Sequence, residues 1–230
     1  MTTLGGGSPS CQVRRLPLPL PTPMRGAFLA ALLVLGIVTP ASAGELAIAA
    51  EGGYLALSSA KKSAQAVFDG SSGGGTFGGS VRFAIDKGFF IAAGARHFSK
   101  EGQRVAVVDP TGPVFPLGHP LKVRLVPVYG QIGYRFRHGR TLVPYLALGA
   151  GSTSFREEST VGGVTTEESQ SKTSEHVAGG VEYGRGGLRV GVELMFSTVP
   201  DTIGVGGVSK VYGETNLGGL SVVGRIAYAF

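Results

Sequence analysis

Apolar residues occupy every second position of the stretch Leu188-Arg189-Val190-Gly191-Val192-Glu193-Leu194-Met195-Phe196-Ser197. Side chains at every second position of a β-strand point to the same face of the sheet. One face of the strand would therefore be apolar and consist of Leu188, Val190, Val192, Leu194 and Phe196. The opposite face would carry Arg189 and Glu193. An alternation of this length indicates a strand that separates an apolar from a polar environment.

The same pattern recurs along most of the chain after residue 43, with varying clarity. Apolar positions alternate with polar or small ones in the segments 46–56, 81–86, 89–96, 126–136, 177–183 and 220–230. The segment Pro144–Ala150 is the least clear strand, because both of its faces are apolar or small. Together these segments predict eight strands.

The connections between these strands alternate between short and long. Tight polar turns are expected at Asp86-Lys87-Gly88, at Arg137-His138-Gly139-Arg140 and at Gly184-Arg185-Gly186-Gly187. Between them we expect longer loops, roughly over 58–75, 99–120, 156–173 and 199–213. Barrels of the outer membrane combine short periplasmic turns with long extracellular loops. The sequence therefore predicts an all-β fold, an eight-stranded antiparallel up-and-down transmembrane β-barrel.

Charged residues in the middle of several strands decide which face is inside. A soluble lipocalin-like barrel would place its apolar residues inside and its polar residues outside. Alternation alone leaves that alternative open, but the mid-strand charges favour a polar lumen with an apolar face toward lipid. The expected lumen residues are Glu51, Arg82, Arg96, Gln131, Glu193 and Arg225. In a closed barrel strands seven and one flank strand eight, so Glu193 and Glu51 are expected beside Arg225.

An eight-stranded barrel is only wide enough for its own side chains. Buried charges are tolerated only when they are paired or hydrated. We therefore expect these six residues to form a salt-bridge plug. A narrow ion path through the same residues is the alternative.

The first 43 residues have the features of an export signal. Arg25 precedes the apolar run Ala27–Val38, Pro40 follows it, and Ala41-Ser42-Ala43 has the small-x-small form of a signal peptidase site. Twelve residues span roughly 18 Å as a helix, too little for a ~30 Å bilayer core. We expect cleavage after Ala43 and a barrel domain over 44–230.

Two alternatives concern the start of this signal. Met24 is a second candidate for the start codon. Arg14-Arg15 could belong to a twin-arginine signal, but the prolines between this pair and the apolar run argue against it.

Composition excludes several functions for the exported chain. Cys11, the only cysteine, precedes the cleavage site, which leaves no thiol for a disulfide, a metal or redox chemistry. All 15 acidic residues but only 18 of the 21 basic residues follow residue 43, so the formal net charge falls from +6 to +3. Without a basic run, this excess does not favour nucleic-acid binding.

The segment Gly224-Arg225-Ile226-Ala227-Tyr228-Ala229-Phe230 resembles the last strand of outer-membrane proteins. That strand ends in Phe, with aromatic or apolar residues at alternate positions before it; the Gly common at position 225 is replaced by Arg. Over nearly the whole exported chain, the protein resembles the small OmpA/OmpX-like outer-membrane β-barrel family. The hairpin around Gly180-Val181-Glu182-Tyr183 and the stretch Phe98–Val105 also carry this resemblance.

The resemblance implies a monomeric, multi-pass barrel in the outer membrane of a Gram-negative-type bacterium. Its partners would be membrane lipids, an unknown extracellular ligand, and the barrel assembly machinery, which would read Ile226, Tyr228 and Phe230 as an assembly signal. No cofactor is implied. Family members include anchors, adhesins, weak pores and enzymes, so the resemblance does not fix the function. We expect a non-enzymatic protein that is structural or that binds ligands through its loops, with a narrow channel as the alternative.

His97 and Ser99 raise the possibility of a lipid-modifying enzyme. Outer-membrane lipid A deacylases use a His and a Ser two positions apart on one strand face as base and nucleophile. Here Lys100 replaces the Asn of that family, and the pair lies early in the chain. We therefore expect His97 to lie at the outer rim of the membrane.

Other candidate chemistry is weaker. The spacing of His119, His138 and His176 does not support a metal site. The glycine-rich runs Gly73–Gly79 and Gly204–Gly207 lack the Lys-Ser/Thr ending of a phosphate loop. Tryptophan is absent, so the interfacial aromatic girdles would consist of Tyr54, Phe89, Tyr134, Phe136, Tyr183, Tyr228 and Phe230.

Overall fold

The computed structural model describes residues 44–85, 88–136, 141–185 and 187–230. The predicted export signal, its cleavage site and Cys11 lie outside the described residues. So do parts of the three predicted short turns, including His138.

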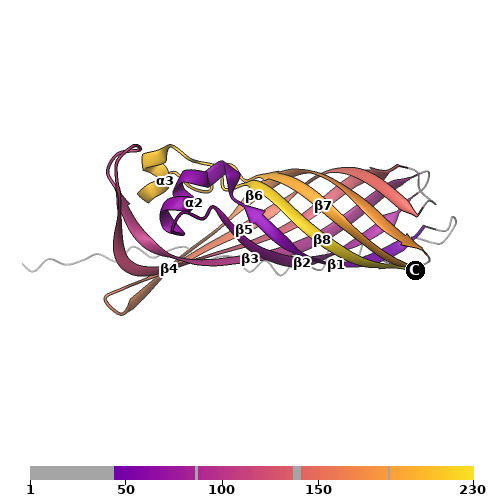
Figure 1. Ribbon diagram of the computed structural model, residues 1–230, viewed down its shortest axis with the longest axis horizontal. Helices are drawn as coiled ribbons and strands as arrows, with labels where there is room; N and C mark the ends of the chain where they lie inside the picture. Colours follow the sequence, from indigo (N-terminus) through magenta and orange to yellow (C-terminus); the bar gives the residue numbers. More distant parts are fainter. Residues whose placement is uncertain (1–43, 86–87, 137–140, 186) are drawn as a thin grey trace, which may run out of the picture. The chain divides into compact units, whose positions relative to one another are not determined.

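Eight antiparallel strands close into a barrel in which each strand pairs with its neighbours in sequence and β1 pairs with β8 (Figure 1). The strands are β1 (Leu46–Ala56), β2 (Gly73–Ala84), β3 (Phe89–Val107), β4 (Val114–Arg135), β5 (Leu142–Val161), β6 (Val164–Arg185), β7 (Leu188–Thr198) and β8 (Gly219–Ala229). The prediction of an eight-stranded up-and-down barrel is confirmed, including the uncertain strand around Pro144–Ala150.

The barrel is apolar outside and polar inside, as the strand pattern predicts. On β7, Leu194 is 50% exposed on the outer face, whereas its neighbours Glu193 and Met195 are 1% and 6% exposed. On β5, Leu146 and Leu148 face outward, and Tyr145 between Pro144 and Leu146 is buried in the interior. This arrangement is the reverse of a lipocalin, so the soluble alternative is wrong.

The predicted long loops over 99–120 and 156–173 are instead continuations of strands. β3 runs to Val107 before β4 begins at Val114, and β5 and β6 are joined by a two-residue turn at Gly162 and Gly163. Both glycines have positive φ, 58° and 80°, as a type I′ hairpin turn requires. In these extensions the outer face of the strands no longer contacts lipid and is polar like the inner face. The alternation of apolar and polar residues that marks the membrane-spanning parts of the strands is therefore missing there.

The other two predicted loops contain short helices. After β1, the 3₁₀ segment η2 (Ser58–Ala60) leads into α2 (Lys61–Val67), and β2 already begins at Gly73. Before β8, the connection contains α3 (Gly207–Tyr212). In the part of the chain that the structure describes, no helix has the length and apolar character needed to cross a membrane.

The two ends of the barrel are different. The C-terminus lies at the end where the short turns connect the strands, and α2 and α3 lie toward the opposite end, where β3–β6 extend furthest (Figure 1). In outer-membrane barrels the short turns are periplasmic. The helices and the long hairpins are therefore on the extracellular side.

Aromatic rings are concentrated on the outer face at the periplasmic end. The rings of Phe89 and Tyr134 are 5.0 Å apart, those of Tyr134 and Phe136 are 5.1 Å apart, and those of Tyr228 and Phe230 are 5.0 Å apart. Exposed Tyr183 belongs to the same end, because it pairs with Leu142 at the start of β5. These side chains form a periplasmic aromatic belt without tryptophan.

Candidate functional site

The six polar residues predicted for the lumen all lie inside the barrel and are almost inaccessible to solvent. Their exposed fractions are 6% for Glu51, 4% for Arg82, 4% for Arg96, 6% for Gln131, 1% for Glu193 and 4% for Arg225. They come from β1, β2, β3, β4, β7 and β8. The structure thus brings residues from six strands into one interior layer.

Glu193 is the centre of this network. One of its carboxylate oxygens accepts a hydrogen bond from Arg96 at 2.5 Å. The other accepts from the Tyr145 hydroxyl at 2.7 Å and from Arg225 at 3.2 Å. A carboxylate can accept several hydrogen bonds at once, and bonds between charged partners are the stronger ones. Glu193 therefore links β3, β5 and β8 through the lumen.

Glu51 joins the same two arginines from the opposite side. Its carboxylate lies 2.8 Å from Nε of Arg96 and 3.2 Å from Nε of Arg225. Ser80 donates a hydrogen bond to Glu51 at 2.7 Å and accepts one from Arg225 at 3.0 Å. Arg225 thus lies between Glu51 and Glu193, as expected from the closure of the barrel.

Arg82 has a partner on a strand that is not its neighbour. Its guanidinium is 2.7 Å from the carboxylate of Glu182 on β6, and it lies over the rings of Phe90 and Tyr145 at 4.6 and 4.9 Å. Aromatic faces attract a desolvated guanidinium. Glu182 also lies 3.6 Å from Arg225, so the two arginines share this carboxylate.

Glu182 and the two tyrosines of the network are missing from the set inferred by sequence reasoning. Glu182 is 3% exposed and lies on the polar face of the alternating segment 177–183, so its position carried the same signal as the others. Tyr145 lies in the strand whose two faces look alike. Tyr129, which donates a hydrogen bond to Glu51 at 3.4 Å, carried the same alternation signal as its neighbour Gln131.

Two further polar contacts extend the network along the barrel. Gln131 lies 3.2 Å from Nε2 of His176, which is buried on β6. Toward the periplasmic end, Glu45 accepts hydrogen bonds from Arg135 at 3.0 Å and from Arg189 at 2.5 Å.

The main layer is balanced in charge, with Arg82, Arg96 and Arg225 set against Glu51, Glu182 and Glu193. Each of these arginines has a carboxylate within 3.2 Å. Desolvating an ion is costly, and a close, hydrogen-bonded partner offsets much of that cost. The arrangement is therefore an ionic core of paired, buried side chains inside the barrel.

An apolar layer lies between this network and the extracellular side. Phe98, Leu125 and Phe155 point inward from the long strands and are 1–5% exposed. They belong to a buried cluster with Leu57 beside η2 and Phe68 at the end of α2. This cluster lies on the extracellular side of the ionic core, so two buried layers follow each other along the lumen.

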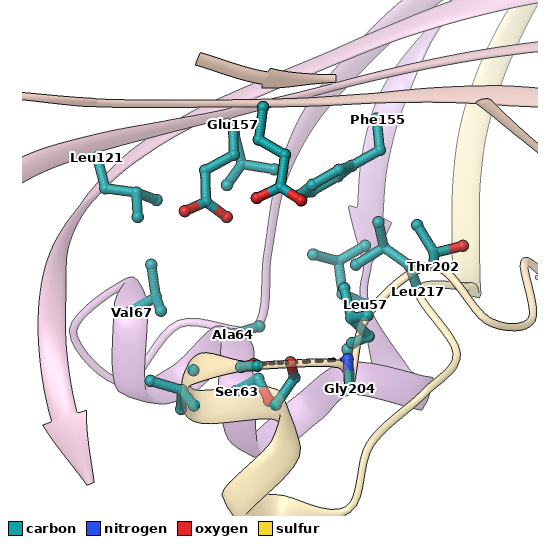
Figure 2. Close-up of a pocket in the computed structure, with 18 of the residues that line it drawn as sticks. Leu57, Ser63, Ala64, Val67, Leu121, Phe155, Glu157, Thr202, Gly204 and Leu217 are labelled. Atoms are coloured by element: carbon teal, nitrogen blue, oxygen red, sulfur yellow. Dashed lines mark hydrogen bonds between the residues drawn. The ribbon is translucent and has the colours of Figure 1, made fainter. Parts of the chain in front are cut away.

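Above this cluster the structure contains a cavity of about 530 Å³. One side is formed by inward residues of the long strands, including Leu121, Phe155 and Glu157, and the other by Leu57 and α2 (Figure 2). The loop before α3 supplies Gly204 and its neighbours as a third side. A volume of 300–1,000 Å³ is typical of sites for small molecules.

The predicted rim pair His97 and Ser99 lies on the outer face of β3. His97 packs against the exposed ring of Phe77, 5.2 Å between ring centroids, and Ser99 is exposed opposite Arg124 of β4. His119 is on β4 and His176 is in the lumen. Among the described residues no group of three His, Cys, Asp or Glu side chains is placed to hold a metal ion.

The residues of the predicted assembly signal point away from the lumen. Ile226, Tyr228 and Phe230 are 61%, 53% and 72% exposed on the outer face of β8 and just beyond it. The glycine-rich run Gly73–Gly79 lies in β2, and Gly204–Gly207 lies at the end of the loop before α3 and at the first residue of that helix.

Comparison with known proteins adds a family and a set of similar folds. The family model described as outer membrane protein beta-barrel domain matches residues 28–200. The crystal structure of Neisserial surface protein A is 15% identical, with a TM-score of 0.52, and the match covers 82% of this chain and 100% of that chain. No curated protein sequence matches this chain significantly.

Two further solved structures have similar folds. One is Ail, the attachment invasion locus protein of Yersinia pestis, in complex with the heparin analogue sucrose octasulfate, at 12% identity and a TM-score of 0.50. The other is a major outer membrane protein from Thermus thermophilus, at 12% identity and a TM-score of 0.52. Each match covers 82% of this chain and 100% of the other chain. At such identities the similarity concerns the fold.

Proposed function

Because the chain belongs to the outer membrane protein beta-barrel family, we propose that it is a non-enzymatic surface protein whose barrel is a closed anchor and whose extracellular hairpins and helices contact ligands. In this proposal the apolar outer wall contacts membrane lipids, and the protein works as a monomer. The assembly machinery would recognise Ile226, Tyr228 and Phe230 during insertion.

The observation that carries the proposal is the packed interior. Three arginines and three glutamates fill the lumen with close ion pairs, and the cluster around Phe98 and Leu125 covers them. Ions entering from either side would have to break charge pairs that lie in a low dielectric. This favours a closed anchor over the narrow channel.

The extracellular part supports a role in binding. β3–β6 have 19–22 residues, whereas β1, β7 and β8 have 11. At roughly 3.3 Å per residue, the extra length extends the four long strands about 25–35 Å further. Because these segments are paired strands, they present a preorganised surface, which lowers the entropic cost of binding.

The charge of this surface bears on the class of ligand. Ail, a structure with a similar fold, binds a heparin analogue, which is a polyanion. The upper part of β5 and β6 here carries the acidic residues Glu157, Glu158, Glu167, Glu168 and Glu175, against Arg156 and Lys172. This excess of negative charge would repel a sulfated glycan from the β5–β6 hairpin, whereas the extended parts of β3 and β4 carry Lys100, Arg104, Lys122 and Arg124 against Glu101. We propose that the β5–β6 hairpin contacts a cationic ligand through its inner, cavity-facing side, where Glu157 and Glu168 lie opposite each other.

Expression in a bacterium whose major porins have been deleted tests this proposal. Cells that produce the protein at the surface should take up small hydrophilic β-lactams no faster than cells with an empty vector. Their lipid A should have an unchanged mass profile. Faster uptake would indicate the channel, and loss of an acyl chain that depends on His97 and Ser99 would indicate the enzyme.

A further inference from the structure

Two glutamates face each other across the β5–β6 hairpin on the wall of the extracellular cavity. Glu157 pairs with Glu168 in the antiparallel register, and both line the cavity. Directly opposite residues of a sheet have Cβ atoms about 4.5–5.5 Å apart, and like charges at such positions are destabilising. The two carboxylates therefore need a counter-charge or a proton.

On the outer face of the same hairpin, a second pair of opposite glutamates is compensated by an arginine. Glu158 lies opposite Glu167, and Arg156 forms ion pairs with both carboxylates, at 3.3 Å to Glu158. Among the described residues no Lys, Arg or His nitrogen lies within 4.0 Å of the inner pair. The outer pair is neutralised by direct ion pairs, whereas the inner pair has Arg104, another residue of the cavity wall, as a nearby cation without a direct ion pair.

The cavity makes the charge of Glu157 more costly. Burial raises the pKa of the Glu157 carboxyl, the charge of Glu168 raises it further, and Arg104 on β3 opposes both effects. Figure 2 shows the side chain of Glu157 pointing from its strand into the cavity. A cation that enters the cavity would meet a partly desolvated carboxylate that, within the described part of the chain, has no direct ion-pair partner.

The rest of the cavity wall is mostly apolar. Leu57, Phe68 and Phe155 are buried at its base, and Val67 and Leu121 line its sides. Apolar walls with a few convergent polar groups are typical of sites for small organic molecules.

Long-range contacts hold these walls in place. The carboxylate of Glu214 accepts hydrogen bonds from the backbone N–H groups of Lys62 and Ser63, both at 2.9 Å, which connects α2 to the segment after α3. Gln170 of β6 donates a hydrogen bond to the carbonyl of Thr202 at 2.5 Å. The cavity is therefore fixed from three sides before any ligand enters.

We propose that this cavity binds a small amphipathic organic cation, with its ammonium or guanidinium group between Glu157 and Glu168 and its apolar body against Leu57, Phe68 and Phe155. The inference rests on the proposed function, since it assigns the ligand class to the extracellular end of a closed barrel. Glu157 and Glu168 together outweigh the single charge of Arg104 on the same wall, which disfavours an anion, and a neutral apolar molecule would leave this excess negative charge uncompensated.

Binding of two fluorescent probes to the full chain in phosphatidylcholine nanodiscs tests the inference. Dansylcadaverine carries an ammonium group on an apolar body, and dansylamide has the same fluorophore without the charge. The carboxamide variant combines Glu157→Gln and Glu168→Gln. Its matched control combines Glu158→Gln and Glu167→Gln on the outer face of the same hairpin. Altered mobility of the folded barrel on unheated gels verifies that each variant is folded.

We expect saturable binding of dansylcadaverine to the wild type and to the outer-face control. In the carboxamide variant the Kd should be about tenfold to hundredfold higher, because hydrogen bonds to a charged group are lost. Equal binding of dansylamide, unchanged binding to the carboxamide variant, or no saturable binding of dansylcadaverine would each overturn the inference. A conducting barrel that still binds the probe would contradict the proposed function instead.

Discussion

Within the lumen, Glu193 accepts hydrogen bonds from Arg96, Tyr145 and Arg225 while being 1% exposed. Because these side chains are almost inaccessible to solvent, the loss of one group leaves the charge of the others less well compensated. The effect of a substitution therefore depends on what remains around it, and this can be measured.

The first prediction concerns the pair Arg225 and Glu193. Arg225→Ala should lower the free energy of unfolding by ~3–5 kcal/mol, because it removes one of the two guanidinium partners of the buried carboxylates and leaves their charge only partly compensated. Combining it with Glu193→Ala should cost less than the sum of the two single losses. Urea unfolding in lipid vesicles gives the free energy of unfolding of the wild type, of the two single variants and of the double variant. Additive losses would mean that the two side chains do not interact.

The second prediction compares two neighbouring positions of β7. Leu194→Arg places a charge on the lipid-facing wall, at a cost of ~2–4 kcal/mol near the bilayer midplane. Met195→Arg instead places a second guanidinium beside Arg96, whose Nη1 lies 3.4 Å from the Met195 sulfur. The penalty of Leu194→Arg should shrink in thinner bilayers, because the charge reaches the interface more easily. The penalty of Met195→Arg should not depend on the thickness of the bilayer. The opposite pattern would mean that Met195 faces the lipid and Leu194 faces the lumen.

Sequence reasoning placed residues on a face more successfully than it paired them. Period-two alternation puts Glu51, Glu193 and Arg225 inside, and closure of the barrel makes them neighbours. Arg82 and Glu182 meet across the lumen from β2 and β6, which share no register. Which inward residues meet across the interior depends on strand tilt and stagger, and these are not encoded in the pattern of one strand.

At the level of elements, the outer halves of β3–β6 are the main difference from the predicted structure. The segment 156–173 is rich in Ser, Thr and Glu on both faces, which is also the composition of a loop. Gly162-Gly163 was the available signal, since two consecutive glycines favour a type I′ turn between paired strands. The apolar band ends near Val126 on β4 and Val177 on β6, and beyond it no apolar outer face is needed.

The third prediction follows from the raised pKa of Glu157. The folded hairpin holds the proton of this carboxyl more tightly than the unfolded hairpin does. The free energy of unfolding of the hairpin should therefore be higher at low pH, where Glu157 is protonated. It should decrease as the pH rises through the raised pKa of Glu157. Hydrogen exchange of the amides between Phe155 and Gln170, corrected for intrinsic rates, should show stronger protection at pH 5 than at pH 7.

Substitutions in the same hairpin provide the control for this effect. Glu157→Gln removes the titrating group, so protection should be high at both pH values. Glu158→Gln, on the outer face, should leave the pH dependence in place. Weaker protection at pH 5 in the wild type, or the same pH dependence in Glu157→Gln, would contradict the repulsion between Glu157 and Glu168.

At the scale of the whole molecule, the barrel is built in layers along its axis. An aromatic belt and the contacts of Glu45 lie at the periplasmic end, the ionic core follows, and the apolar cluster and the cavity lie toward the outside. The lipid-facing wall and the ionic core could be predicted from the sequence. The cavity could not, because it depends on how α2 and the loop before α3 pack against strands far away in the chain.

The fourth prediction concerns insertion of the whole barrel. Phe230 is 72% exposed, so removing it deletes little packing area. If the assembly machinery reads the terminal strand, deletion of Phe230 should reduce insertion in cells far more than refolding in detergent. Outer-membrane fractionation and the heat-dependent mobility of the refolded protein give the two values. Similar losses in both measurements would exclude a recognition role for this residue.

The central claim is that paired charges close the barrel, so that the protein acts at its extracellular end. Single-channel recording of the purified protein in planar lipid bilayers tests this most directly. We predict little or no steady current for the wild type, and more leakage for Arg225→Ala and for Glu193→Ala, because each removes part of the packed ionic core. A large and stable wild-type conductance that either substitution alters would show that the same charges line an open path, and it would contradict the account.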